Sequence, residues 1–595
     1  MKSLYENDTD CFTPVLFITS PGSDPSDELQ EFASTEIGRQ GYHELAMGGG
    51  DNQIAIEMMK DAAEKGEWVC LKNLHLVTPW LATLEKEFKL LSPDKKFRLW
   101  LTSEPHAKFP SILLKTSLTI TYESPPGIKN NLQRTYQSWA QTFDEGNLLK
   151  SQILFILAWF NSVIQERRKY IPQGWSKYYE FSYGDLKAGE TILSEIVDGS
   201  QGQLPQWDIV HGLLENAIYG GRVDNPFDMR VLKTYLKQFF NGDIFQGVKR
   251  LSNIVQVPKA ASIKDYFQYI AKLSDQDQPV MFGLPPNIDR SVQRFNSQRY
   301  INLLKQITAV SKEDLKFDRD MWAKALGPIL KLWKSIYSPE GFRSLKIKPG
   351  HLNSEDPVDA FTYMEAHSML VTLQRINETL SSIAKVIKGT GMLTSKIESE
   401  AMSLLKREVP ESWCKFWEGP ETPQDWLIKF EKKASALLGW VDRIQSGGLL
   451  QNSLDLSHLF HPETFFNALR QKSGRELRSP IDDLKLVSTF ERKAVGGKIS
   501  IQLDGLYLQG SGFSSGKIVD QSSDNLQELL PLPPCTIAWV RKAEADPYSE
   551  GSTVNIPVYF SILRENLLCE LKIPNSGSAD ERIISGVAVF LDGSD

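Results

Sequence analysis

A short acidic loop follows the first apolar run of the chain, at a place where many α/β proteins bind phosphate. The loop contains Ser20, Gly22, Asp24 and Asp27. A P-loop needs a glycine-bounded turn whose amides surround phosphate, followed by a lysine and a serine or threonine for the outer phosphates and magnesium. No lysine or arginine occurs in the range 13–38. The residues therefore predict a phosphate loop that has lost its cation.

The same acidic residues are expected to occupy the start of the following helix. Asp24 suits the N-cap position and Pro25 the first helical position, while Asp27 and Glu28 place negative charge in the first turn. These carboxylates would satisfy the amides that otherwise bind an anion, and they would repel a polyphosphate. Because a charge-assisted hydrogen bond contributes about 1.5–3 kcal/mol, ATP would lose several such contributions here.

The carboxylates of a P-loop ATPase are also missing from their expected strand. The third core strand of such an enzyme ends in acidic residues that hold magnesium and polarise water, whereas here the apolar run 68–71 is followed by Lys72 and Asn73. Two independent requirements fail together, so we expect no bound nucleotide, no catalytic residue and no metal site. The alternative is a free-standing NTPase whose phosphate cation comes from elsewhere, such as Lys72 or Arg98, although Arg98 is most simply a surface cation.

The periodicity of the first 130 residues indicates the elements that would position this loop. Apolar runs alternate with amphipathic segments, which predicts a parallel sheet covered by helices on both faces. The expected strands are 14–19, 43–47, 68–71, 97–102 and 118–122, and the expected helices are 26–39, 51–65 and 80–91.

The remaining residues differ in character from this first part, and they differ among themselves. They are mostly helical to about residue 485, with long helices expected at 149–169, 314–337 and 364–408 and with 165–169 as a solvated helix end. From about residue 493 the period becomes two, which predicts a small antiparallel barrel or sandwich. The fold class is thus multidomain α/β, all-α and β. The expected domains are 12–131 (α/β), 132–285 (helical lid), 286–485 (helical) and 486–595 (β-barrel).

Composition excludes several classes of protein. A chain of 595 residues is too long for one hydrophobic core, and a net charge of −7 argues against nucleic acid as a partner. The five cysteines are scattered without a Cys-x-x-Cys pair, which supports neither a disulfide scaffold nor a zinc ribbon. The longest apolar runs fall short of the ~20 residues of a membrane span, so we expect no membrane insertion and an intracellular location.

Two polar clusters could do chemistry but have simpler explanations. His458 and His461 could bind a metal, yet they lack a third ligand nearby, so capping is the simpler role. Ser103, Glu104 and His106 follow a strand, where α/β sites usually lie, but they do not form the Gly-x-Ser-x-Gly turn of a hydrolase. The triple glycine before residue 51 is interpreted as a flexible strand-to-helix loop.

Several motifs in one order resemble the C-terminal end of dynein heavy chains. The first of these motifs contains the acidic loop. Three other motifs are Gly-Glu-Trp-Val-Cys-Leu-Lys-Asn-Leu-His, Tyr-Gly-Gly-Arg-Val-Asp and Leu-Phe-His-Pro-Glu-Thr-Phe. Two further blocks, 211–222 and 455–462, are most similar to the cytoplasmic dynein-2 branch, the intraflagellar-transport dyneins. The matching stretches are 17–28, 66–75, 97–105, 108–110, 125–131, 219–224, 459–465 and the terminal β region.

This resemblance implies a role as part of a motor. It implies a sixth AAA+ module that binds no nucleotide and closes a ring, its helical lid, and a regulatory C-terminal domain ending in a β-barrel. The whole motor would use ATP and magnesium in upstream modules to move toward microtubule minus ends. Its partners would be neighbouring AAA+ modules, dynein intermediate, light-intermediate and light chains, and microtubules, in the cytoplasm, cytoskeleton and cilium (axoneme). A different possibility is an adaptor that binds a partner peptide through its β-module.

Overall fold

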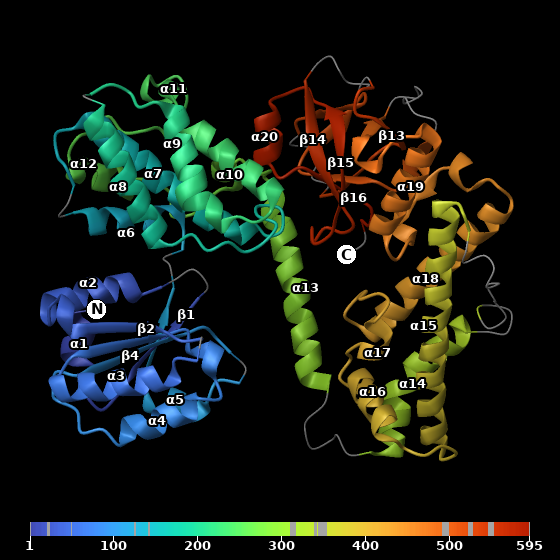
Figure 1. Cartoon of the computed structure of the whole chain (residues 1–595), viewed down its shortest axis with the longest axis horizontal. Coiled ribbons are helices and arrows are strands. Elements are labelled where there is room, and N and C mark those ends of the chain that lie inside the picture. The colour runs from blue at the N-terminus through green and yellow to red at the C-terminus, as the bar shows by residue number, and fades with distance from the viewer. Residues whose placement is uncertain are drawn as a thin grey trace. The chain divides into compact units, whose positions relative to one another are not determined.

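The computed structural model divides the chain into two compact units (Figure 1). One unit comprises residues 1–169 and 177–282, and the other comprises 170–176 and 283–595. The described residues are 2–20, 24–48, 50–106, 108–123, 126–140, 143–200, 202–309, 317–337, 342, 354–490, 499–521, 528–544 and 552–593.

The first unit begins with the parallel sheet that the apolar runs predict. All five expected strands are present, and each is within two residues of its expected bounds. Every pairing between them is parallel, in the order β2-β3-β4-β1-β5. This order places β4 between β1 and β3. Because the strands are parallel, the loops that follow β1 and β3 lie at the same edge of the sheet. The strands are β1 (Val15–Thr19), β2 (Tyr42–Ala46), β3 (Trp68–Lys72), β4 (Arg98–Ser103) and β5 (Leu118–Tyr122).

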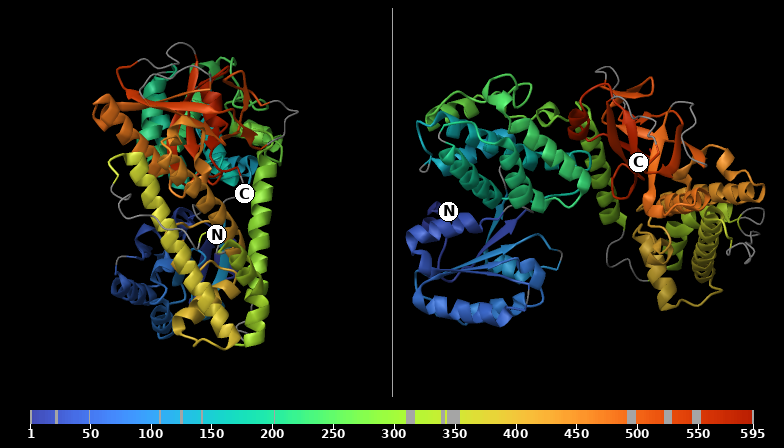
Figure 2. Two further views of the ribbon diagram at one scale, coloured as in Figure 1. Left: turned by 90° about the vertical axis from the view of Figure 1, so that its right-hand side faces the viewer. Right: turned by 45° about the horizontal axis from the view of Figure 1, so that its top comes forward.

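Helices cover both faces of this sheet, as predicted (Figure 2). On one face α3 (Asn52–Lys65), α4 (Leu81–Lys89) and α5 (Ser111–Thr116) bury alternate strand residues that include Leu16 and Leu71. On the other face α1 (Lys2–Asn7) and α2 (Ser26–Glu36) pack against the intervening residues, which include Phe17, Trp68 and Trp100. A strand directs successive side chains to opposite faces, so a strand that is apolar at every position must be covered twice.

The rest of the first unit is helical. Its central helix, α7, has the length and apolar composition of a membrane span over 148–170, but 83% of that apolar window is buried inside the protein. The apolar side chains of α7 therefore form part of the core of the first unit. The helices are α6 (Ile128–Trp139), α7 (Leu148–Glu166), α8 (Tyr183–Gly199), α9 (Trp207–Leu213), α10 (Pro226–Phe239), α11 (Gly242–Phe245) and α12 (Ile263–Ala271).

The expectation of a solvated end for α7 is wrong. Gln165 and Glu166 are buried, and Arg167 is fully buried with its guanidinium donating to the Tyr235 hydroxyl at 2.6 Å and the Phe282 carbonyl at 3.0 Å. A buried cation needs such acceptors to offset its lost hydration. Of the basic run, Arg168 is half-buried and only Lys169 is exposed.

The second unit contains a helical block. The single helix expected over 364–408 is wrong, because the chain forms α15, a turn, and then α16. Gly389 ends α15 with a left-handed φ of +77°, a conformation that glycine adopts without strain. The first residues of the helix expected from 314 lie outside the described residues. The helices are α13 (Ile288–Ala309), α14 (Arg319–Ile336), α15 (Pro357–Lys388), α16 (Ser395–Leu405), α17 (Glu411–Cys414), α18 (Pro423–Gln445) and α19 (Pro462–Leu477).

The C-terminal strands form two principal sheets in the described residues. One has the order β12-β9-β16-β14-β15 and the other β6-β8-β13-β7, and most of their pairings are antiparallel. The strands are β6 (Leu454–Asp455), β7 (Leu484–Thr489), β8 (Ser500–Asp504), β9 (Tyr507–Gln509), β10 (Gly512–Ser514), β11 (Lys517–Val519), β12 (Leu530–Pro531), β13 (Cys535–Arg541), β14 (Thr553–Tyr559), β15 (Leu567–Pro574) and β16 (Ala588–Phe590), and α20 (Ala579–Ile584) precedes β16.

Candidate functional site

The acidic loop lies at the carboxyl end of β1, beside the end of β3. Ser20 continues the sheet by one residue, since its amide donates to the Tyr122 carbonyl at 3.3 Å. Gly22 and the side chain of Asp27 lie outside the described residues. The position is that of a phosphate loop in a parallel α/β sheet.

Asp24 satisfies the first amide of α2, which begins at Ser26 as expected and ends at Glu36, but the expectation that Asp24 is the N-cap and Pro25 the first helical residue is wrong. Its Oδ1 accepts hydrogen bonds from the Ser26 amide at 2.9 Å and the Ser26 hydroxyl at 2.5 Å. Pro25 takes the flanking position and its carbonyl accepts from Leu29 at 2.9 Å. The carboxylate thus occupies an amide that an anion would need.

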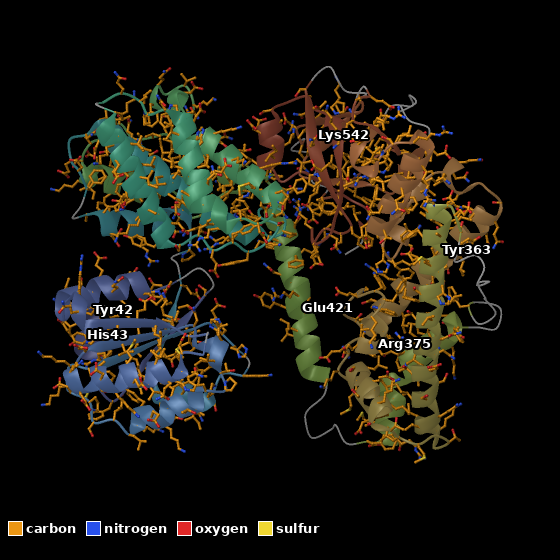
Figure 3. The ribbon with its side chains drawn as sticks, in the orientation of Figure 1. Tyr42, His43, Tyr363, Arg375, Glu421 and Lys542 are labelled. Atoms are coloured by element: carbon orange, nitrogen blue, oxygen red, sulfur yellow. The ribbon has the colours of Figure 1, made fainter. Side chains whose placement is uncertain are left out.

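Lys72 is tied to that same carboxylate. Its Nζ lies 2.9 Å from Asp24 Oδ2 and 2.9 Å from Glu44 Oε1, and the Tyr42 hydroxyl (Figure 3) donates to Glu44 Oε2 at 3.2 Å. A working site has its lysine on the loop after β1 and its carboxylate on the acidic strand. Here the two charges have exchanged places, and they neutralise each other.

The pairing shifts the pKa values of both Lys72 and Asp24. Burial alone would lower the pKa of Lys72, but its bonds to Asp24 and Glu44 raise it above the ordinary value. Burial alone would raise the pKa of Asp24, yet its bonds to Ser26 and Lys72 bring it below the ordinary value. Both groups are therefore charged at neutral pH, and each has the other as its counterion.

Asn73 contributes a backbone turn to the site. It adopts a left-handed φ of +60°, which asparagine tolerates better than most residues, and its amide donates to the Thr102 hydroxyl at 3.3 Å. This turn directs the chain away from the sheet directly after Lys72. The strand end therefore carries a cation and an amide side chain where an ATPase would carry two acids.

An arginine that was not predicted as part of the site contacts the residues beside the acidic loop. Arg134, on α6, forms an ion pair with Glu28 in the first turn of α2 and donates to the Tyr122 hydroxyl. Its guanidinium also lies 5.6 Å from the centre of the Tyr122 ring. The partners are separated by 106 residues in sequence, so only the fold could reveal the contact.

Neither Lys72 nor Arg98, the two cations that the NTPase alternative names, is placed to bind phosphate. Lys72 is already paired, and Arg98 lies at the opposite, amino end of β4. Arg98 is also buried rather than a surface cation as expected, because its guanidinium donates to Thr9 Oγ1 at 2.9 Å and to the carbonyls of Lys95 and Phe97 at 2.9 and 2.8 Å.

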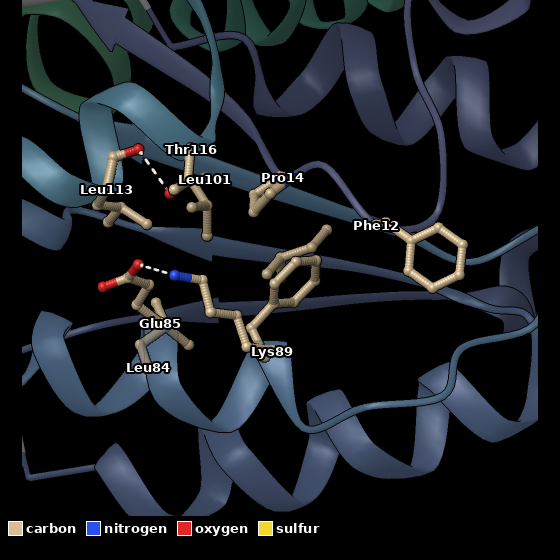
Figure 4. Close-up of a pocket in the computed structure, with 10 residues that line it drawn as sticks. Phe12, Pro14, Leu84, Glu85, Lys89, Leu101, Leu113 and Thr116 are labelled. Atoms are coloured by element: carbon tan, nitrogen blue, oxygen red, sulfur yellow. Dashed lines mark hydrogen bonds and ion pairs between the residues drawn. The ribbon is translucent and has the colours of Figure 1, made fainter.

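A small apolar pocket of about 50 Å³ lies near the amino end of the sheet (Figure 4). It is bounded by Phe12, Pro14, Leu101 and Leu113, with the Lys89–Glu85 ion pair at its rim. Ligand pockets usually measure about 300–1,000 Å³. This pocket is too small for a nucleotide and lies away from the acidic loop.

The other two candidate clusters are not assembled for catalysis. Ser103 donates to the Glu104 carbonyl at 3.0 Å, while His106 Nδ1 accepts from the Lys108 amide at 3.2 Å, so no serine–histidine pair forms. No group of three or more metal-ligating side chains occurs within the described ranges.

The two histidines of the 455–462 block do not act through capping side chains. His461 occupies the N-cap of α19, but its imidazole makes no hydrogen bond to the first amides of the helix. Instead, Glu365 accepts from its amide at 2.7 Å and lies 3.2 Å from its Nδ1. This hydrogen bond raises the pKa of His461. His458 Nε2 lies 3.7 Å from Asp455.

The geometry defines an α/β module with the parallel sheet of a P-loop protein, in which Asp24 of the loop after β1 pairs with Lys72 at the end of β3. Three family models of dynein heavy chains match: the region D6 P-loop domain over residues 10–121, the AAA lid domain over 150–288, and the C-terminal domain over 296–591. The protein belongs to the dynein heavy chain family, as its motifs predict.

Relatives within that family support the likeness to dynein-2. The chain is 44% identical to cytoplasmic dynein 2 heavy chain 1 of Tripneustes gratilla over 97% of its length, and 42% identical to that of Homo sapiens over 99%. The cytoplasmic dynein heavy chain of Dictyostelium discoideum is 29% identical over 98%. The chain spans only 14% of the two dynein-2 relatives and 13% of the third.

Proposed function

We propose that this chain is the C-terminal part of a dynein heavy chain, in which the α/β module closes a ring of AAA+ modules without binding or hydrolysing ATP. The observation that carries the proposal is the exchanged pair of Asp24 and Lys72. A site with this polarity offers triphosphate a carboxylate where it needs a cation, and it offers magnesium an ammonium group where it needs carboxylates. The module acts as a rigid spacer that passes on conformational change through its packing.

The intact protein, on this proposal, is an ATP-driven, minus-end-directed microtubule motor for retrograde intraflagellar transport. The dynein-2 names of its relatives support this assignment. ATP and magnesium would act in upstream modules. The partners would be those modules, the intermediate, light-intermediate and light chains, and microtubules, with the complex located in the cytoplasm, cytoskeleton and ciliary axoneme.

We assign four domains to the chain: the α/β module 12–131, the lid 132–285, a helical domain 286–485 and a β-barrel 486–595. Closure of the barrel is supported by a contact between the two sheets, because the Ser488 hydroxyl on β7 donates to the Lys572 carbonyl on β15 at 3.2 Å. The last two domains would regulate the motor as a brake. Deleting 486–595 from the full motor should therefore change its force or processivity, and unchanged motility would contradict the brake.

A nucleotide titration tests the main proposal. Fluorescent ATP analogue is added to the full chain with magnesium, and again with chelator. We expect no saturable signal in the micromolar range under either condition. Magnesium-dependent micromolar binding would overturn the proposal in favour of the NTPase alternative.

A variant sharpens the titration. Asp24→Asn removes the carboxylate that holds Lys72 and leaves the fold of the sheet untouched, since Asp24 is more than half exposed. If the exchanged charge is what excludes nucleotide, this variant should bind weakly where the unmodified protein does not. The matched control is Asp61→Asn, which removes a carboxylate from the exposed pair with Lys65 on α3.

A further inference from the structure

An open hollow of about 560 Å³ lies on the helical part of the first unit, between the segment 250–260 and α12. The helix supplies Asp265, Gln268 and Tyr269, and its C-cap residue Lys272 completes this wall. These residues follow the 3, 4 and 7 spacing of one helix face. The hollow is therefore bounded by one face of a helix and by a loop that runs along it, and its volume is that of a ligand site.

The hollow carries an excess of positive charge. Arg250, Lys259 and Lys272 line it together with a single carboxylate, that of Asp265. Across the described residues none of these three cations has an ion-pair partner. In a protein whose net charge is −7, such a concentration of unpaired cations is a local feature that favours an anionic partner.

Glu145 accepts hydrogen bonds from the Ser262 hydroxyl and the Ile263 amide at the start of α12, and two carboxylates that flank the lining segments in sequence form ion pairs with other lysines. Asp243 pairs with Lys249 at 3.1 Å, and Asp275 pairs with Lys129 at 2.8 Å. They are consequently not available to balance the hollow. An incoming ligand that supplies carboxylates would make the contacts that the protein itself does not.

The loop wall is held in place through alternate backbone carbonyls. Those of residues 256, 258 and 260 accept hydrogen bonds at 2.7, 3.2 and 2.9 Å from the side chains of Tyr269, Gln152 and Tyr266, respectively. Every second carbonyl therefore points toward α12 or α7, which is the alternation of an extended strand.

The other edge of this segment is unpaired. In an extended strand the N–H and C=O groups of the intervening residues point to the opposite side, and here these are Val257 and Lys259. No hydrogen bond involves their amides in the part of the chain that the structure describes. The segment thus has the properties of a short sheet edge that faces water, beside three cations.

We propose that this hollow binds an extended acidic peptide. The peptide would add as a strand to the free edge at Val257 and Lys259, and alternate carboxylates would meet Arg250, Lys259 and Lys272. Val257, Pro258 and the ring of Tyr269 supply apolar contact between the charges. An acidic peptide fits both features, whereas a small inorganic anion would use the charges alone.

The test is fluorescence anisotropy on the full chain with a fluorescein-labelled octapeptide of alternating glutamate and valine. We expect saturable binding, weakened by about tenfold or more in the double variant Lys259→Glu/Lys272→Glu, because two attractions become repulsions. Val257→Pro removes one amide donor and keeps every charge, so it should weaken binding by about threefold or more. The matched control is Lys237→Glu, an exposed lysine on α10 outside the hollow, which should stay within about twofold.

Circular dichroism and the melting temperature of each variant establish that the fold is kept, since all of these side chains lie at the surface or half-buried. Absence of saturable binding to the unmodified protein would overturn the proposal. So would equal binding of the corresponding lysine–valine peptide. Full displacement by tripolyphosphate together with an unchanged affinity of Val257→Pro would assign the hollow to inorganic anions instead of a peptide.

Discussion

Replacing Lys72 by methionine tests whether the exchanged charge pair holds the loop after β1 against the end of β3. Lys72 is 18% exposed, and its partners Asp24 and Glu44 are 51% and 34% exposed. Partly exposed ion pairs contribute about 0.2–1 kcal/mol each. Loss of two pairs, leaving two carboxylates near each other, should therefore lower the local free energy of opening by about 0.5–2 kcal/mol.

Hydrogen–deuterium exchange measures this local loss, because a protein of several domains has no single free energy of unfolding. Amides in the first turn of α2 and in β2 should exchange about 2- to 30-fold faster in Lys72→Met. The control is Lys65→Met, which removes an exposed pair with Asp61 on α3 and should change exchange by about twofold at most.

The effect also has a defined pH dependence. The pKa of Asp24 is lowered in the folded protein from its ordinary 3.8, so its contribution is present above that value and is lost as the pH falls through the lowered pKa. The difference between Lys72→Met and the unmodified protein should therefore shrink in acid. Equal exchange in both proteins at neutral pH, or the same acceleration in Lys65→Met, would refute the reasoning.

Three further predictions concern charges inside the fold. Burial lowers the pKa of Lys433 to about 8 from 10.5. Since the opened segment then holds more protons between these values, the local free energy of opening around Lys433 should rise with pH from 8 to 10.5 by up to about 3 kcal/mol. Hydrogen–deuterium exchange measures this rise, and Lys433→Met should remove it. The hydrogen bond to Glu365 raises the pKa of His461 from 6.5. The contribution of this pair to stability is therefore complete below pH 6.5 and is lost as the pH rises through the folded pKa. Hydrogen exchange in residues 459–465 should accelerate at alkaline pH, and the acceleration should be smaller in His461→Gln. Arg134→Met should loosen α6 from α2 by about 1–2 kcal/mol, visible as faster proteolysis or exchange near Glu28; an unchanged rate would show that the ion pair contributes nothing.

The sequence was sufficient for the sheet, and it also predicts the loss of the nucleotide site. Five apolar runs with helical segments between them predict parallel strands, because only a sheet covered on both faces buries every position. The missing lysine after Gly22 and the missing acids after residue 71 are local facts, so they can be seen without a structure.

Contacts between distant residues were not predictable in this way. Asp24 and Lys72 are 48 positions apart, and Glu28 and Arg134 are 106 apart, so their pairing follows from strand order and from the placement of α6. The burial of Arg167 was missed because a run of basic residues usually ends in water. The break at Gly389 did have a signal, since two glycines flank Thr390, but the apolar spacing on either side outweighed it.

The ion pairs around Lys72 have a consequence for how this module is made. Asp24, Glu44 and Lys72 are encoded between residues 24 and 72, but β4 (Arg98–Ser103) lies between β1 and β3, so the three charges can meet only after Ser103 has also been synthesised. A nucleotide-dependent module completes its cleft only when a cofactor arrives, and its rigidity follows the energy state of the cell. Here Asp24 and Glu44 supply the counterions of Lys72 from within the chain itself, so this charge is balanced without an added ion.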